Sequence, residues 1–164
     1  MGAMPVAEIA RDRSEPRVRQ VAFFLPNRLG ALRRAMQLLT DQDVRIGGIS
    51  VLESADHAVV RLVVDRPDGA VDILTGAGYG AAITEILGVM LPPGPRFGMQ
   101  RVLSVLLGAE VNLWYVYALI LQADGHPILA LQADDLEMAG RVLRANDFPL
   151  VGQDDLQWPD NDGT

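Results

Sequence analysis

The sequence lacks several residue types on which protein chemistry often depends. Its 164 residues include no cysteine, no lysine and only two histidines. Without cysteine, disulfides, thiolate metal sites and a cysteine nucleophile are excluded. Without lysine, Schiff-base chemistry and phosphate binding by a P-loop lose the residue on which they rest. Two histidines offer little material for a histidine-based metal site, so we expect neither a metal nor a cofactor.

Aromatic residues are also scarce, at 5%, whereas apolar residues make up 49% of the chain. This composition is typical of an aliphatic globule of one domain or two small ones. The formal net charge is −7, which argues against nucleic-acid binding because phosphates require a basic face. No G-x-S-x-G, H-E-x-x-H or P-loop motif is present, and we therefore expect a protein that is not an enzyme.

The first residues contain no apolar run of the kind found in signal peptides, and the interpretation is a cytoplasmic protein. One later stretch, residues 102–121, is apolar over twenty residues and long enough to span a bilayer. Glu110 lies near its centre, where a carboxylate costs about 2.5 to 3.5 kcal/mol on insertion scales. Together with the repeat described next, this favours a helix followed by a strand over a membrane span.

The chain contains an internal repeat, which we read as two copies of a unit of about 70 residues. Residues 38–52 (LLTDQDVRIGGISVL) match residues 105–119 (VLLGAEVNLWYVYAL). His57 matches His126 further along, with a two-residue hairpin insertion between the matches. In both copies an aliphatic helix end leads through an acidic residue and a valine into a strand.

Hydrophobic periodicity predicts the same element order in each copy. The expected strands are 18–25, 44–52, 57–64, 82–91, 111–121, 127–132 and 149–153, and the expected helices are 31–42, from Asp65 or Asp68 to about 77, 99–107 and 134–145. Strand 82–91 closes the first copy and opens the second. The fold class is therefore α+β, with two tandem ferredoxin-like βαββαβ units whose antiparallel sheets are covered by helices on one face.

The expected organisation follows from these elements. Residues 1–16 form a disordered N-terminal segment, 17–84 the first domain, 85–153 the second domain and 154–164 a disordered acidic tail. The aspartates of that tail do not have the spacing of an EF-hand loop. Trp114, Tyr115 and Tyr117 lie on one strand of the second copy, where they form either a surface for a partner or part of the core.

The most informative segment is residues 25–32, LPNRLGAL. Gly30 lies where a strand turns into a helix, and glycine there allows a ligand to approach the backbone closely. The N–H groups of the first helical turn favour a carboxylate, and Asn27 adds a neutral donor and acceptor. The structural alternative is that Asn27 is a turn or N-cap residue and that Gly30 relieves strain.

A βαββαβ unit with N-R-x-G-x-L at its first turn resembles an ACT domain, the small-molecule sensor module of amino-acid metabolism. Both copies share the resemblance, and the first copy is the better match, because Asp43–Val44–Arg45–Ile46 follows the motif as an acidic–Val–x–Ile step. The resemblance implies a ligand held between two domains, by the first turn of one and by the second strand of the other. The serine-sensing members use one asparagine from each of these two elements.

Here the two asparagines are divided between the copies. Asn27 is in the first turn of copy one, and Asn112 is at the second strand of copy two. Side-by-side pairing within one chain would bring them together. The resemblance then implies a ligand site formed by Asn27, Arg28, Leu29, Gly30, Ala31, Leu32, Asn112, Leu113 and Trp114. The reciprocal, weaker site consists of Pro93, Gly94, Arg96, Phe97, Arg45 and Ile46, and departs from the family pattern.

The resemblance predicts a regulatory protein that binds a free amino acid or a related small carboxylate. Ligand binding would change its association with itself, as a homodimer, or with a metabolic enzyme on which it acts in trans. The alternative is an interaction or oligomerisation module that works without a ligand. Neither hypothesis involves nucleic acid or a membrane.

Overall fold

The computed structural model describes residues 15–94 and 98–160. The first unit contains two helices and the strands around them, in the order βαββαβ. Its elements are β1 (Val18–Pro26), α2 (Ala31–Thr40), β2 (Ile46–Glu53), β3 (His57–Val64), α3 (Pro67–Gly76) and β4 (Ala81–Met90). The second unit continues with α4 (Gly98–Gly108), β5 (Leu113–Ala123), β6 (His126–Ala133), α5 (Leu136–Ala145), β7 (Leu150–Val151) and the 3-10 turn η1 (Gln153–Asp155).

The sheet order is β2-β3-β1-β4-β6-β5, with β7 also paired to β4. Strand β4 serves both units. Residues 81–86 of β4 pair antiparallel with β1, and residues 87–90 pair antiparallel with β6. Each unit therefore has the antiparallel arrangement of a ferredoxin-like fold, and the predicted fold class is confirmed. The predicted strand 82–91, common to both copies, corresponds to β4.

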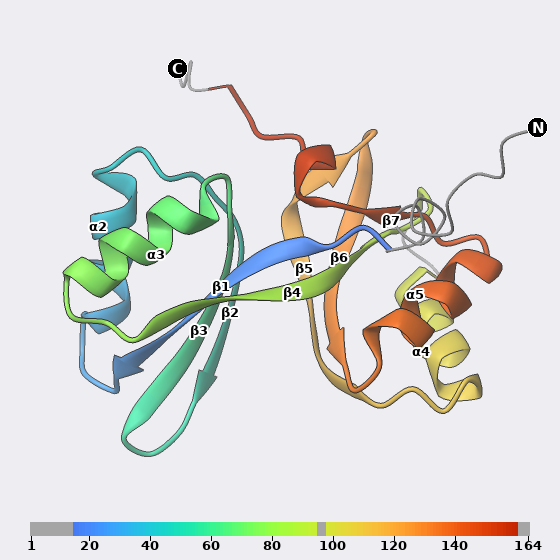
Figure 1. Cartoon of the computed structure of the whole chain (residues 1–164), viewed down its shortest axis with the longest axis horizontal. Coiled ribbons are helices and arrows are strands. Elements are labelled where there is room, and N and C mark those ends of the chain that lie inside the picture. Colours follow the sequence, from blue (N-terminus) through green and yellow to red (C-terminus); the bar gives the residue numbers. More distant parts are fainter. Residues whose placement is uncertain (1–14, 95–97, 161–164) are drawn as a thin grey trace, which may run out of the picture.

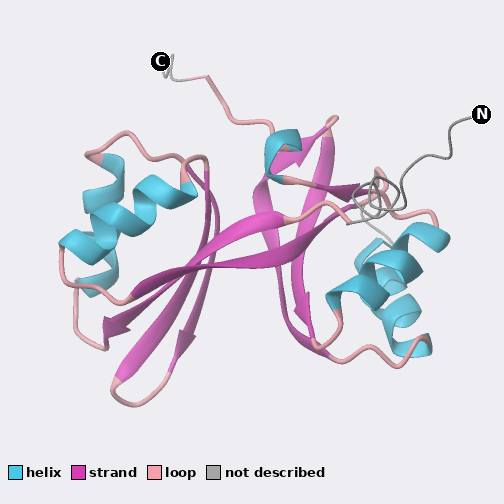
Figure 2. Ribbon diagram, viewed as in Figure 1, coloured by secondary structure: helices cyan, strands magenta, loops and turns pink. Residues whose placement is uncertain are grey.

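The helices lie on the two outer sides of the molecule, and the sheets face one another in the middle (Figure 2). Helices α2 and α3 cover one sheet, with Phe23, Leu39 and Leu62 in the core between them. Helices α4 and α5 cover the other sheet, with Leu106 and Leu131 in its core. A third cluster of buried residues lies between the sheets, so the open face of each sheet is partly covered by the other.

Two glycines of β2 allow the sheets to approach. A Cβ on Gly47 would lie 2.5 Å from Cγ of Leu121, and one on Gly48 would overlap the side chain of Leu119. Leu119 and Leu121 belong to β5 and are buried. The pair of glycines in the predicted strand 44–52 therefore has a packing role that the strand pattern did not explain.

A polar network crosses the same interface. Gln20 of β1 is 1% exposed, and its Nε2 donates to the Tyr115 hydroxyl at 2.8 Å and to Thr84 Oγ1 at 3.0 Å. The Tyr117 hydroxyl donates to Gln20 Oε1 at 2.7 Å. The Arg61 guanidinium lies 3.9 Å from the centre of the Tyr115 ring. Of the two interpretations of the aromatic strand, Tyr115 and Tyr117 thus support packing within the chain, whereas Trp114 is 63% exposed.

One local expectation needs correction. Neither Asp65 nor Asp68 caps α3, because Asp65 binds Arg45 and Asp68 binds Arg19. By contrast, the stretch 102–121 divides into α4 and β5, as predicted, and no helix in the described ranges is long and apolar enough to cross a membrane.

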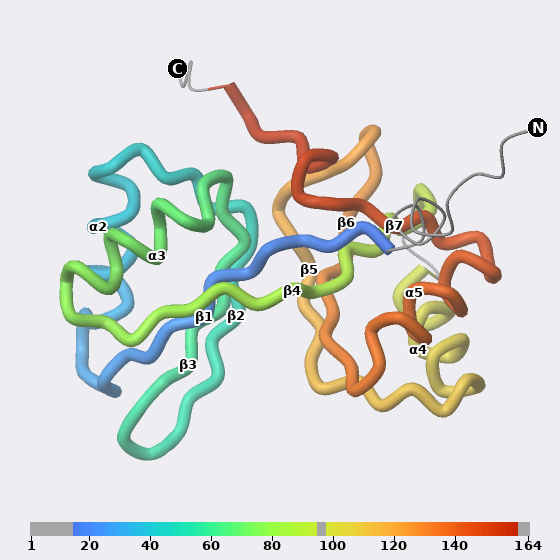
Figure 3. The backbone as a smooth tube through the Cα atoms, viewed as in Figure 1, coloured from blue at the N-terminus to red at the C-terminus, as the bar shows by residue number. Residues whose placement is uncertain are grey.

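The C-terminal segment also differs from the expectation of a disordered tail beginning at residue 154. Leu156 is buried, Gln157 forms an isolated bridge with Gln122, and Trp158 packs on the cluster between the sheets. Figure 3 shows this segment crossing between the two units. Leu156 and Trp158, two positions apart, both point into this cluster and hold the segment against the sheets. Residues 1–14 and 161–164 of the expected disordered segments lie outside the described ranges.

Candidate ligand-binding turn and interface cavity

The turn between β1 and α2 lies where the sequence predicted that a strand turns into a helix. Gly30 is in the left-handed region, with φ 80° and ψ 0°, at the N-cap position of α2. No side chain caps this helix, and its first turn contains no acidic residue. The positive end of the helix dipole therefore remains available to an anion.

Arginines surround this helix start. A cavity of about 270 Å³ is lined by Gly30, Arg33, Arg34 and Gln37. Leu29, next to Gly30, is fully exposed. The Asn27 main-chain N–H donates to the Asp56 carbonyl at 3.1 Å, and its side-chain amide is 3.5 Å from the Ser54 carbonyl. That longer contact is weak, so the amide of Asn27 can turn towards a ligand at little cost.

The remaining turn residues differ in their exposure to solvent. Arg28 is exposed, Leu32 is partly buried against the core of the first unit, and Ala31 is buried within it. The main-chain N–H of Ala31 donates to the Arg28 carbonyl at 3.1 Å. Of these three, Arg28 alone offers a side chain to a ligand.

The second predicted component, at the start of β5, lies elsewhere. Asn112 is exposed, and its main chain exchanges two hydrogen bonds of 3.1 Å with Asp134. Leu113 packs against the core of the second unit, whereas Trp114 is exposed. In Figure 1, β1 ends at the left of the molecule and β5 begins in its right half. The sheets stack face to face, so the structure does not bring Asn27 and Asn112 of one chain together.

The predicted reciprocal site is also divided. Pro93 and Gly94 are exposed in the turn after β4, and Arg96 and Phe97 lie outside the described ranges. Arg45 and Ile46 line a different cavity, of about 360 Å³, where the start of β2 meets the end of β5. Neither Pro93 nor Gly94 is among the residues that line it. The C-terminal residues Gln157, Trp158 and Pro159 complete its wall.

Sequence reasoning missed the partner that orients Arg45. Asp65 Oδ1 accepts the Arg45 main-chain N–H at 2.9 Å, and its Oδ2 accepts Nε at 2.9 Å. The second unit repeats the main-chain part of this arrangement, since Asp134 Oδ1 accepts the N–H of Asn112 at 3.1 Å. The available signal was that Asp65 and Asp134 are separated by 69 residues, as His57 and His126 are. The same residue at matching positions of both copies indicates a shared contact.

The family model for the ACT domain pair matches residues 17–158. The chain therefore belongs to the ACT domain pair family, a class of regulatory modules. The predicted resemblance to ACT domains is confirmed.

Solved structures agree on the fold. Protein BT0572 from Bacteroides thetaiotaomicron has a TM-score of 0.74 and 23% identity, with 85% of this chain and 94% of that chain covered. The regulatory subunit of aspartate kinase from Thermus thermophilus, in a ligand-free form, has a TM-score of 0.57 and 12% identity over 80% and 93%. The corresponding subunit from Thermus flavus has a TM-score of 0.51 at 12% identity over 80% and 93%. No curated protein matches the sequence.

Proposed function

We propose that this chain is a regulatory protein that binds a free amino acid or a related small carboxylate and acts in trans on a metabolic enzyme. The observation that carries the proposal is the start of α2, which combines a left-handed Gly30, no side-chain cap and the arginines Arg33 and Arg34 beside a cavity. Family membership supports a regulatory role, and the chain itself would have no catalytic activity.

The chemistry of the turn fits an α-carboxylate. A carboxylate at the start of α2 meets main-chain N–H groups, the helix dipole and two guanidinium groups. Asn27 and Gln37 have side-chain amides that accept from an ammonium group. A ligand of about nine heavy atoms, at roughly 0.5 to 0.7 kcal/mol per atom, would bind with a Kd of about 10 μM to 1 mM.

We further propose that a second copy of the chain completes this site. In the family pattern, the second strand of a neighbouring domain faces the turn, and the strand that carries asparagine here is β5. Within one chain Asn112 lies away from the turn, so the β5 of a partner copy would supply it. The exposed Leu29 and Trp114 support this arrangement, because a dimer that joined the two elements would cover both side chains.

A thermal-shift screen against the twenty amino acids and common α-keto acids tests the binding. A ligand at a hundred times its Kd stabilises the folded chain by about 2.7 kcal/mol, which raises Tm by several degrees at this size. Asn27→Ala should weaken binding of the active compound at least tenfold. Gln100→Ala, which removes an exposed amide from α4, is the control and should bind normally.

Mixing two variants tests whether the site is shared between chains. Asn27→Ala and Asn112→Ala should each bind at least tenfold more weakly alone, and neither should show sites of wild-type affinity. In an equal mixture of exchanging dimers, about a quarter of the sites would combine an intact turn with an intact strand. Calorimetry should therefore recover about a quarter of the wild-type stoichiometry. No recovery in a mixture that demonstrably exchanges subunits would exclude a shared site.

A ligand-independent interaction module is the competing function. It predicts no thermal shift at millimolar concentrations and an oligomeric state unaffected by metabolites. Sedimentation of the wild-type chain with and without the screened compounds separates the two, because ligand-dependent association is expected only of the sensor.

A further inference from the structure

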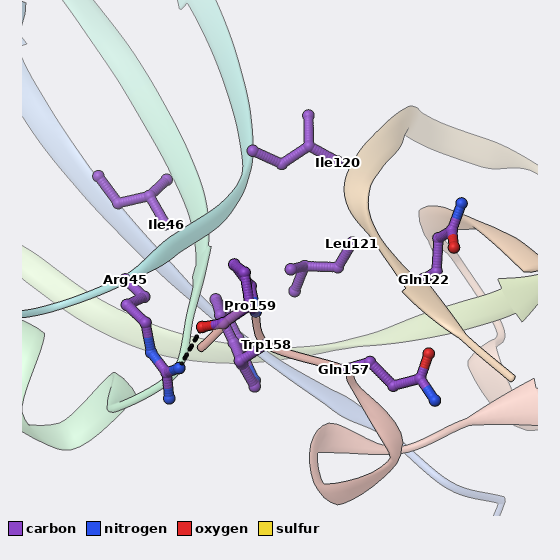
Figure 4. A pocket seen from close by; sticks show the side chains of 8 residues that line it. All are labelled: Arg45, Ile46, Ile120, Leu121, Gln122, Gln157, Trp158 and Pro159. Carbon is purple, nitrogen blue, oxygen red and sulfur yellow. Dashed lines mark hydrogen bonds between the residues drawn. The ribbon is translucent and has the colours of Figure 1, made fainter. Parts of the chain in front are cut away.

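The cavity beside Arg45 differs from the turn site in both position and composition. It lies where the first residues of β2, the last residues of β5 and the C-terminal segment meet, and Figure 4 shows the side chains that line it. Its volume, about 360 Å³, is within the range of small-molecule sites. Both units of a single chain contribute to it, so it needs no second copy.

Arg45 is held in a fixed direction at one side of this cavity. Asp65, whose side chain is only 11% exposed, contacts both its main-chain N–H and its Nε at 2.9 Å. The far end of the guanidinium is thereby aimed towards the C-terminal segment. There Nη1 donates a hydrogen bond of 2.7 Å to the main-chain carbonyl of Pro159. Figure 4 shows this bond.

The other walls are mostly apolar. Ile46, Ile120, Leu121 and the ring of Trp158 line the cavity, with the Arg45 guanidinium 5.7 Å from the centre of that ring. Figure 4 places Gln122 and Gln157 on the side away from Arg45. The guanidinium at one side and the hydrocarbon walls between it and the two amides suit a small molecule with a carboxylate followed by an aliphatic chain.

The Pro159 carbonyl accepts a hydrogen bond from Arg45 Nη1. A carboxylate would be a stronger acceptor for the same N–H group. A carbonyl oxygen is a neutral acceptor, whereas a carboxylate carries the charge opposite to the guanidinium and can accept two parallel N–H···O bonds from it. The five N–H donors of arginine also allow two-point binding. Pro159 and Asp160 are exposed, so little buried surface holds this part of the segment in place.

We propose that the Arg45 cavity binds a small aliphatic carboxylate, whose carboxylate replaces the Pro159 carbonyl on Arg45. The end of the C-terminal segment is then an internal competitor for the site. This inference does not rest on the turn site, which uses other residues. It goes beyond the proposed function because it adds a second site within one chain and couples it to the position of the C-terminal segment.

Titration of the full chain with 4-methyl-2-oxopentanoate and with leucine tests the proposal, with isoamyl alcohol as the matched probe that lacks a carboxylate. We expect saturable binding of at least one acid, with a Kd on the order of 1 mM, and none of the alcohol. The Trp158 ring lines the cavity beside Arg45, so a carboxylate bound there should change wild-type fluorescence. In Trp158→Phe that fluorescence change should be absent while NMR still detects the ligand.

Two substitutions should move the affinity in opposite directions. Arg45→Ala should abolish binding, whereas Pro159→Gly should tighten it about two- to fivefold, because a more flexible segment competes less well. Pro159→Gly leaves the Arg45–Asp65 pair intact and therefore keeps the test valid if Arg45→Ala does not fold. Arg141→Gln, on the exposed face of α5, is the charge control and should bind normally.

The turn variant separates this proposal from the proposed function. Asn27→Ala should leave binding at the Arg45 cavity unchanged, and binding that depends on Asn27 but not on Arg45 would belong to the turn. The inference is overturned if neither acid binds in the millimolar range, if the alcohol binds equally well, or if Pro159→Gly has no effect or weakens the affinity.

Discussion

The hydroxyl group of Tyr117 donates a hydrogen bond of 2.7 Å to the side-chain oxygen of Gln20, joining β5 of the second unit to β1 of the first. Gln20 is the one buried polar side chain found among the described residues. The same amide also donates to Tyr115 of β5 and to Thr84 of the adjacent strand β4. Its two contacts with the tyrosines of β5 therefore hold the two sheets in one register.

Replacement of Gln20 by leucine should destabilise the chain by about 1 to 3 kcal/mol, because it leaves the Tyr117 hydroxyl without its acceptor. The double variant Gln20→Leu/Tyr117→Phe should recover part of that loss, since both polar partners are then removed. Urea unfolding of the single and double variants measures this coupling. Gln100→Leu, at an exposed position of α4, should change stability by less than about 0.5 kcal/mol. Strict additivity of the two interface substitutions would contradict the coupling.

Alkaline pH should weaken the interface. Partial burial, followed by the proximity of Tyr115, raises the pKa of the Tyr117 hydroxyl well above its usual value. The folded state therefore keeps a proton that the unfolded chain loses near pH 10. The stabilisation is fully present below pH 10 and declines above it, by up to about 1.4 kcal/mol per pH unit. Tyr117→Phe should show a shallower decline in unfolding free energy over the same range, and an identical slope would argue against this origin.

The close approach of β2 and β5 can be tested at Gly47. Alanine there would place Cβ 2.5 Å from Cγ of Leu121 and 3.0 Å from the Trp158 ring. Because both neighbours are packed, we expect a loss of about 1 to 3 kcal/mol. Gly69→Ala in α3 is the control, since its nearest neighbour would be 3.8 Å away, and it should be neutral or up to about 1 kcal/mol stabilising. Thermal unfolding of the two variants compares them directly.

The ligand-binding role of the turn can be separated from its backbone strain. Gly30 and Gly78 both have positive φ, of 80° and 91°, and alanine at either should cost about 1 to 2 kcal/mol. Only Gly30→Ala should also weaken binding of the compound found by thermal shift, because its Cβ would enter the turn beside Arg34. Equal affinities in the two variants would locate the ligand elsewhere.

The repeat was the strongest signal in the sequence, and it predicted the element order and the shared strand. The two copies also share local backbone, since Asp43 and Glu110 occupy matching positions of the repeat and both have φ of 56°. The packing of one unit on the other could not be read from the same pattern. Periodicity identifies which face of a strand is apolar, but both faces of these sheets are covered, and side-by-side and face-to-face packing require similar apolar content.

For the candidate sites too, the sequence predicted local conformation but not which distant residues come together. The Gly30 turn was predicted because its conformation depends on neighbours in the sequence. The proximity of Asn27 and Asn112 depended on long-range packing, and the structure separates them. The Arg45 cavity was missed in part because Trp158 and Pro159 lie in a stretch rich in aspartate, glycine and proline. Such a composition predicts a solvent-exposed segment. A single apolar residue such as Leu156 is too weak a signal to predict packing instead.

Strand β4 couples the unfolding of the two units. Its amide groups are hydrogen-bonded to β1 over one half and to β6 over the other, so neither unit can melt without removing an inner strand from its neighbour. Calorimetry should show a single two-state transition for a chain with two homologous halves. Amide hydrogens along the whole of β4 should exchange with solvent only through that transition. A duplicated architecture has in this way become one folding unit.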